Sequence, residues 1–154
     1  INTGILAGYK WHRTARVWPT PVAGEILQAA AFRSMFRRVI SNQEPKGLPR
    51  PFVDEMYDNY DRRTRRAVLD IYRDMKKVGR TSKGLIPLLA AANIPALVIW
   101  GAGDPYLPAS FADRQRSAFP SAQVHIIPGS GHWPFIDDPP AVIELLTAFL
   151  DSVE

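Results

Sequence analysis

The chain has 154 residues, of which 46% are hydrophobic and 22% charged, a balance typical of a globular domain rather than of a disordered chain. It contains no cysteine, which excludes disulfides and thiolate metal sites and is compatible with a reducing cytoplasm. No apolar run approaches the roughly 20 residues that a membrane span needs. We therefore expect a cytoplasmic protein without a membrane span.

The net charge of +4 is distributed unevenly. Residues 1–93 carry 17 Lys and Arg against 8 Asp and Glu, whereas residues 94–154 carry 2 against 7. The densest basic run, residues 62–66, would suit a nucleic-acid-binding stripe. Interspersed acidic residues favour a solvated helix face instead, and we expect no nucleic-acid partner. Apolar residues also recur at helical spacing just after this run, at Val68, Ile71, Tyr72 and Met75.

The first part of the chain is predicted to be mostly helical. Residues 1–8 are expected to be the end of a core strand and the start of a helical lid, and residues 9–92 are expected to form that lid. Pro and Gly predict a loop at residues 45–51, and Gly79 is expected to end a helix as its C-cap. The predicted helices cover residues 9–16, 24–40, 52–60, 64–78 and 83–92.

The last part, residues 93–154, is predicted to be a core segment of alternating strands and helices. Residues 94–100 and 124–127 are apolar runs without polar alternation, which is typical of strands buried on both faces. Residues 109–119 predict a covering helix, so the two strands are expected to be parallel neighbours in a βαβ unit.

A final helix is expected after Asp138, which occupies the N-cap position ahead of Pro139 and Pro140. Apolar residues then recur on one side, which predicts a buried stripe. The stripe consists of Val142, Leu145, Leu146 and Phe149.

An acid and an imidazole follow the two predicted strands. Asp104 lies just beyond the first strand and His132 just beyond the second, at the strand ends where open α/β sheets place their chemistry. A histidine can take up a proton and return it within one cycle, while an aspartate on its other nitrogen fixes the tautomer. Each residue alone would also suit a turn or a surface loop. Their joint position favours an acid–base pair, with the two side chains within hydrogen-bonding distance.

The sequence around these residues resembles the α/β-hydrolase family. Residues 94–108 read I-P-A-L-V-I-W-G-A-G-D-P-Y-L-P, and residues 124–140 read V-H-I-I-P-G-S-G-H-W-P-F-I-D-D-P-P. In that family the order is nucleophile, acid, histidine, so the resemblance implies Asp104 as the acid and His132 as the general base. Residues 1–93 resemble the lid of the epoxide hydrolase and haloalkane dehalogenase branch. The implied fold class is α/β: the C-terminal part of an α/β-hydrolase sheet, with the last parallel strands and their flanking helices, plus a helical lid.

The resemblance also implies a nucleophile that these residues lack. The family carries it on a strand-to-helix turn written G-x-S-x-G, or with Asp in place of Ser, and no such pentapeptide occurs here. We therefore expect the chain to be the C-terminal half of a longer protein, with the N-terminal half of the same protein as its partner. The isolated chain is expected to be inactive.

Three further residues are candidates for substrate binding. The resemblance suggests that Tyr57 and Tyr60 hydrogen-bond an epoxide oxygen, as two lid tyrosines do in epoxide hydrolases, although such tyrosines also pack in a core or line a cleft. Trp133, beside His132, is expected either to line the substrate cleft or to pack against the lid. The 3 histidines lack carboxylates at metal-binding spacing, so no metal site is expected. No cofactor is implied.

Two classes of function remain open. The first is a hydrolase acting on a small, largely apolar substrate through a covalent intermediate. The substrate is an ester or amide if the nucleophile is Ser and an epoxide or haloalkane if it is Asp, and the resemblance of the lid favours the second case. The second is a non-catalytic hydrolase-like protein that binds a ligand or acts as a scaffold. The presence of both Asp104 and His132 favours the hydrolase. The sequence leaves the oligomeric state open.

Overall fold

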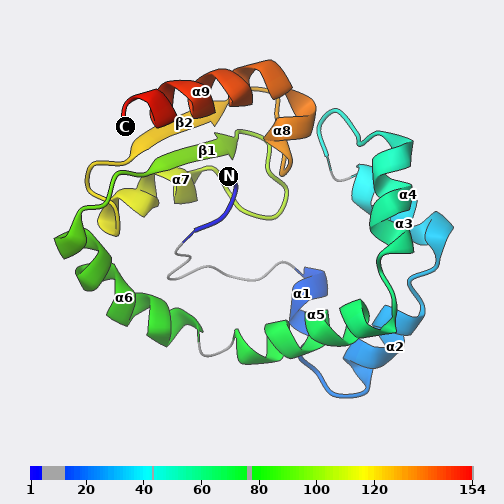
Figure 1. Cartoon of the computed structure of the whole chain (residues 1–154). Helices are drawn as coiled ribbons and strands as arrows, with labels where there is room; N and C mark the ends of the chain where they lie inside the picture. The colour runs from blue at the N-terminus through cyan, green and yellow to red at the C-terminus, as the bar shows by residue number, and fades with distance from the viewer. Residues whose placement is uncertain (5–12, 43, 76–77, 154) are drawn as a thin grey trace. The chain divides into compact units, whose positions relative to one another are not determined.

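The computed structural model describes residues 1–4, 13–42, 44–75 and 78–153 (Figure 1). The chain divides into two compact units. Unit 1 consists of residues 1–6, 44–46 and 81–154, and unit 2 consists of residues 7–43 and 47–80.

The centre of unit 1 is a parallel pair of strands, β1 (Leu97–Gly101) and β2 (Gln123–Ile127). The register runs from the pair Leu97–Gln123 to the pair Gly101–Ile127. The crossover between the strands contains α7 (Ser110–Arg114) and a 3₁₀ turn (Gln115–Ser117). Helix α7 lies on one side of the sheet and α9 (Pro139–Asp151) on the other (Figure 1). The predicted βαβ unit with parallel strands is confirmed.

Two of these elements are shorter than predicted. Strand β1 begins at Leu97 rather than at residue 94, since Pro95 has no N–H to contribute to a ladder. The helix predicted over residues 109–119 leaves α-helical geometry after Arg114. The chain turns there, because the N–H groups of Ala118 and Phe119 both donate to Gln115 O at 2.9 Å.

Helix α9 begins as predicted, with a side-chain cap. The Asp138 carboxylate accepts a hydrogen bond from Ala141 N at 3.3 Å, and two prolines occupy the first turn. The first half of the helix packs on the sheet, where Val142 joins Ile99 and Ile127 in a buried cluster. Burial of this apolar face is the main favourable free-energy contribution that fixes α9 on the strands.

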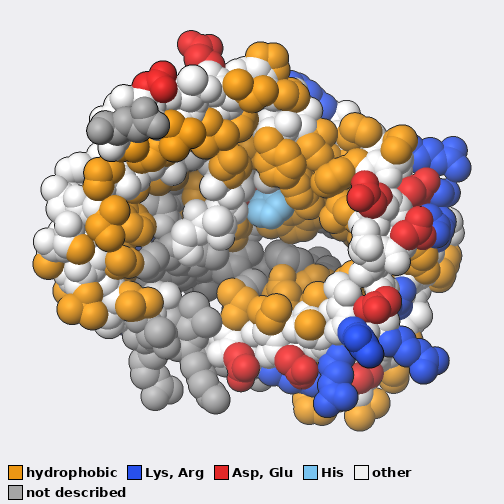
Figure 2. Space-filling model, in the orientation of Figure 1, with side chains coloured by type: hydrophobic (Ala, Val, Ile, Leu, Met, Phe, Trp, Pro, Cys, Tyr) orange, Lys and Arg blue, Asp and Glu red, His pale blue; other side chains and the backbone are white. Residues whose placement is uncertain are grey.

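The predicted burial of Leu146 in the α9 stripe is wrong, because this side chain is 38% exposed. Leu146 and Leu150 border an open apolar groove of about 440 Å³ beside β1. Only the first half of the predicted stripe is therefore covered by the sheet, and hydrophobic side chains are visible along α9 (Figure 2).

Residues 1–4 lie beside β1, where Asn2 N donates to Ile99 O at 3.0 Å. They form no strand of the sheet, although the sequence predicts the end of a core strand there. The φ of 43° at Asn2 lies in the left-handed region and interrupts an extended backbone. Residues 5–8 lie outside the described residues.

All the elements described in unit 2 are helices, and the boundary between the two units falls within α6. Residues 9–12 of the first predicted helix lie outside the described residues. The helices are α1 (Arg13–Val17), α2 (Ala23–Ala29), α3 (Arg33–Asn42), α4 (Arg50–Asp58), α5 (Arg62–Asp74) and α6 (Val78–Ala92). Helix α2 packs on α5, and α3 packs on α4 (Figure 1).

The single helix predicted over residues 24–40 is wrong, since the structure has α2 and α3 with a break at residues 30–32. Carbonyl groups at the end of α2 and in the break accept from a side chain, and Gln28 O also accepts from Ala31 N at 3.4 Å. The guanidinium of Arg65 donates to Gln28 O and, at 3.0 Å, to Ala31 O. A contact from α5 therefore ends a helix that the apolar pattern would continue.

The predicted role of Gly79 is also wrong. Helix α5 ends at Asp74, with Met75 as its C-cap, and Gly79 lies in the first turn of α6. The start of α6 at Val78 also precedes the predicted start of that helix at residue 83. A glycine marks a boundary between helices without showing to which helix it belongs.

Charged side chains are concentrated in unit 2, and Figure 2 shows Lys and Arg over its helices. In the part of the chain that the structure describes, no helix combines the length and the apolar character that crossing a bilayer requires.

Candidate active site

The strands of unit 1 continue into two loops, the acid loop (residues 102–107) after β1 and the histidine loop (residues 128–133) after β2. The loops stay joined beyond the sheet, because Gly103 N donates to Ser130 O at 2.9 Å. Gly101 is required here, since a Cβ at this position would collide with the backbone of the histidine loop. This close approach brings Asp104 and His132 together.

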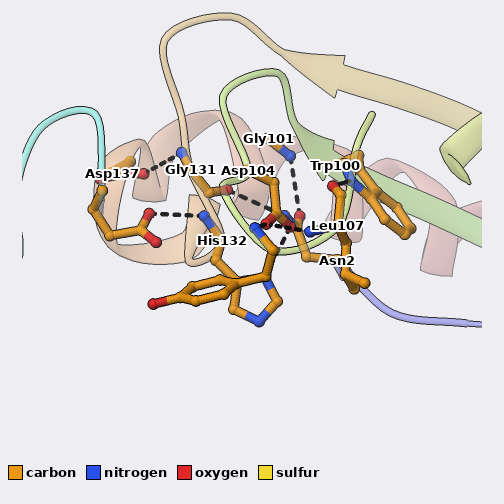
Figure 3. Close-up of polar contacts among 10 residues, drawn as sticks. Asn2, Trp100, Gly101, Asp104, Leu107, Gly131, His132 and Asp137 are labelled. Carbon is orange, nitrogen blue, oxygen red and sulfur yellow. Dashed lines mark hydrogen bonds and ion pairs between the residues drawn. The ribbon is translucent and has the colours of Figure 1, made fainter. Parts of the chain in front are cut away.

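The imidazole of His132 meets the carboxylate of Asp104 in the structure. Nδ1 of His132 lies 2.8 Å from Oδ2 of Asp104 (Figure 3). The Asp104 side chain is fully buried, whereas that of His132 is 27% exposed. The distance confirms the expected approach of the two side chains, and the catalytic roles assigned to them stay predictions.

Four donors surround the Asp104 carboxylate. Oδ1 accepts from Tyr106 N at 2.7 Å and Leu107 N at 2.8 Å, while Oδ2 accepts from Asn2 Nδ2 at 2.6 Å as well as from His132. Burial raises the pKa of Asp104, but the hydrogen bonds from His132 and the two backbone N–H groups, with the charge of His132, outweigh it. The net pKa lies below the ordinary value of 3.8, so the carboxylate is ionised at neutral pH.

An ionised carboxylate can only accept hydrogen bonds, so the proton between the two side chains belongs to Nδ1 of His132. In the neutral imidazole, Nε2 then carries the free lone pair and can accept a proton from another group. The carboxylate fixes both the tautomer and the direction of the ring. Such a pair could act as a general base oriented by an acid, a role that stays a prediction.

Asn2 joins the two loops, which the sequence analysis did not predict. Its Nδ2 donates to Asp104 Oδ2 and, at 3.1 Å, to Gly131 O, while its Oδ1 accepts from Gly101 N at 3.0 Å. Asn2 is buried, with only 3% of the residue exposed. No local motif marks Asn2, because its partners lie 99 to 129 positions further along the chain.

Two further carboxylates hold the backbone of the histidine loop, and neither was predicted. Glu44 Oε2 accepts from His132 N at 2.8 Å, and Asp137 Oδ2 accepts from Gly131 N at 2.7 Å. Asp137 could be sought in the sequence because it follows the histidine closely. Glu44 gives no such signal, since it precedes its partner by 88 positions.

Two aromatic rings lie beside the imidazole. The rings of Tyr106 and Trp133 each lie 5.0 Å from that of His132, and 6.1 Å from each other, all edge-on. Together they form an apolar wall next to the imidazole. Tyr106 was not among the predicted site residues, and the role of Trp133 as cleft lining or as packing stays a prediction.

Tyr57 and Tyr60 belong to unit 2, and both are engaged by side chains of that unit. The Tyr57 ring lies 5.5 Å from that of Phe36 and 4.8 Å from the guanidinium of Arg33. The Tyr60 hydroxyl donates to Gln28 Oε1 at 2.5 Å, and burial raises its pKa. Their role in substrate binding stays a prediction.

Within the described ranges, no three His, Asp or Glu side chains are grouped to hold a metal ion. His125 is half-buried in β2, and His12 lies outside the described residues.

The model of the alpha/beta hydrolase family matches residues 4–145, which is most of the chain. The chain therefore belongs to the alpha/beta hydrolase family, and the predicted fold class is confirmed.

The relatives that the chain resembles are longer proteins. It is 43% identical over 61 residues to Rv2715, an uncharacterized protein of Mycobacterium tuberculosis (strain ATCC 25618 / H37Rv), covering 40% of this chain and 18% of that protein. It is 37% identical over 64 residues to esterase YbfF of Escherichia coli (strain K12), covering 42% of this chain and 25% of the esterase.

A solved structure, that of a membrane phospholipase A described as a bacterial virulence factor, is similar with a TM-score of 0.54 and 18% identity. The match covers 98% of this chain and 47% of the phospholipase. At this identity the likeness shows the fold alone. The matches thus span less than half the length of each of these three proteins.

Proposed function

We propose that this chain supplies the acid and the base of a hydrolase that cleaves carboxylic esters through a covalent acyl-enzyme. The observation that carries the proposal is the contact of 2.8 Å between His132 Nδ1 and a fully buried Asp104 carboxylate. The similarity to esterase YbfF supports an ester as the substrate. The nucleophile, a serine in this proposal, comes from polypeptide outside these 154 residues.

In the first half-reaction the serine oxygen attacks the ester carbonyl carbon, and Nε2 of His132 takes the hydroxyl proton. The tetrahedral intermediate expels the alcohol, which receives that proton from the imidazolium. Asp104 remains ionised and stabilises the imidazolium while it lasts.

In the second half-reaction a water molecule attacks the acyl-enzyme, and Nε2 takes one of its protons. The carboxylic acid leaves, and the serine oxygen regains the proton from the imidazolium. The apolar wall of Tyr106 and Trp133 beside the base favours a substrate whose reacting end is largely apolar.

The test compares hydrolysis of a nitrophenyl ester by the full-length protein and its variants. We expect His132→Gln and Asp104→Asn to lower kcat by about 10³–10⁴-fold or more, since either change removes the oriented base. His125→Gln is the matched control, because this histidine lies in β2, and it should stay close to the wild-type rate.

Undiminished hydrolysis by His132→Gln would remove this residue from the mechanism. Turnover of epoxides or haloalkanes in place of esters would assign an aspartate nucleophile and contradict the ester proposal. Ligand binding without turnover would contradict catalysis itself and favour the non-catalytic class.

A further inference from the structure

Glu44 is a buried carboxylate that the proposed reaction does not use. The residue is 5% exposed, and its Oε2 accepts from the backbone N–H of His132 at 2.8 Å. Its other oxygen, Oε1, has no hydrogen-bond partner in the described part of the chain. A buried carboxylate is costly unless it is paired, so its position against the backbone of His132 calls for an explanation.

The segment around Glu44 fits closely onto both loops of the site. A Cβ on Gly131 would collide with the Glu44 carboxylate and with Pro45. A Cβ on Gly103, in the acid loop, would collide with the Pro45 side chain. Lys46 Nζ donates to Asp137 O at 3.1 Å. Glu44 and Pro45 therefore lie against the loops that carry the acid and the base, and Lys46 contacts Asp137 just beyond the histidine loop.

Opposing contributions act on the pKa of Glu44, which lies above its ordinary value of 4.5. Burial raises its pKa, the hydrogen bond from His132 N lowers it, and the nearby carboxylates of Asp137 and Asp104 raise it. The charge of His132 lowers it, so an imidazolium favours the ionised form of Glu44. The Glu44 carboxylate therefore interacts electrostatically with the His132 side chain and accepts a hydrogen bond from its backbone.

We propose that Glu44 is a positioning residue for the general base, fixing the backbone of His132 by accepting its N–H. The inference rests on the proposed function. Asp104 holds the imidazole at Nδ1, while Glu44 holds the main chain from which the side chain projects. Without the second contact the histidine loop can shift, and a misplacement of about 1 Å costs on the order of 10²-fold in rate.

The test uses two variants of Glu44 in the full-length enzyme. Glu44→Gln keeps a side-chain oxygen that can accept from His132 N, so it should retain most of kcat. Glu44→Ala removes the acceptor and should lower kcat by about 10–100-fold with little change in KM, because no group that contacts substrate is altered. Glu144→Ala, at an exposed glutamate of α9 in the same unit, is the matched control and should leave both constants unchanged.

A wild-type kcat for Glu44→Ala would overturn the proposal. So would a Glu44→Gln enzyme as slow as Glu44→Ala, because the retained acceptor should restore the loop. An increase in KM alone would overturn it as well, since that result would place Glu44 in substrate binding.

Amide hydrogen exchange of the wild-type protein tests the contact without any variant, and it decides the matter if the variants fail to fold. The N–H of His132 should exchange slowly because it donates to a buried carboxylate. Exchange at the rate of an exposed loop amide would contradict the proposal. A wild-type protein with a protected His132 amide but no ester hydrolysis would refute the proposed function and leave the contact standing.

Discussion

Asp104 is the residue on which the geometry of the site depends most. Its carboxylate binds donors from the acid loop, from His132 and from Asn2. Because the pKa of Asp104 is lower in the folded state, its carboxylate stabilises the protein at pH values above the ordinary pKa of 3.8. That contribution is lost as the pH falls through the lower pKa of the folded state. The stability that the Asp104 carboxylate contributes is therefore present at neutral pH and lost in acid.

Replacing Asn2 by alanine should destabilise the fold. Asn2→Ala leaves Gly101 N and Gly131 O without their side-chain partner and removes one donor from Asp104. We expect a loss of about 1–3 kcal/mol in the free energy of unfolding, measured by urea denaturation. As a control, Asn59→Ala at an exposed asparagine should change it by less than about 0.5 kcal/mol. Equal effects of the two substitutions would contradict a linking role for Asn2.

The site residues that could be predicted from the sequence are those that come directly after a strand. Asp104 and His132 come just after apolar strands, so their side chains could be placed at one end of the sheet from the sequence. Asn2 and Glu44 reach the same place from distant segments, 102 and 88 positions away from their partners Asp104 and His132. Such contacts depend on the path of the whole chain and leave no local pattern.

At the scale of elements, the cap of α9 gives a direct prediction. Asp138→Ala removes the acceptor for Ala141 N and should lower the free energy of unfolding by about 1 kcal/mol. Asp138→Asn, which keeps a side-chain oxygen at the cap, should retain most of that stability. Urea denaturation of the three proteins measures both effects. An Asn variant as unstable as the Ala variant would show that the cap hydrogen bond is not what stabilises the start of α9.

Elements were predictable where local chemistry decides them. The start of α9 follows from Asp138 and the two prolines, and the parallel strands follow from their apolar runs. The break between α2 and α3 escaped prediction because it depends on Arg65, which bonds to carbonyls more than 30 positions away in sequence. The exposure of Leu146 escaped it as well, since a periodic stripe does not show how far the sheet beneath it extends.

For the whole molecule, part of the basic charge of unit 2 is paired with carboxylates of the same unit. Arg33 and Arg37 contact Asp54, Arg66 contacts Asp70, and Arg73 contacts Glu25. Such exposed pairs contribute little stability, but they reduce the field of a basic surface. They agree with a solvated helical face, and the assignment of unit 2 as a lid stays a prediction.

The measurement that tests the central claim most directly is covalent labelling of the full-length protein with a fluorophosphonate, followed by peptide mapping. Such a reagent phosphonylates an activated serine and releases fluoride, so it reports on the nucleophile and on the base that activates it. We predict a label on a serine outside these 154 residues, formed on the order of 10³-fold more slowly in His132→Gln than in the wild type. A label within this chain, or an unchanged labelling rate in His132→Gln, would contradict the account.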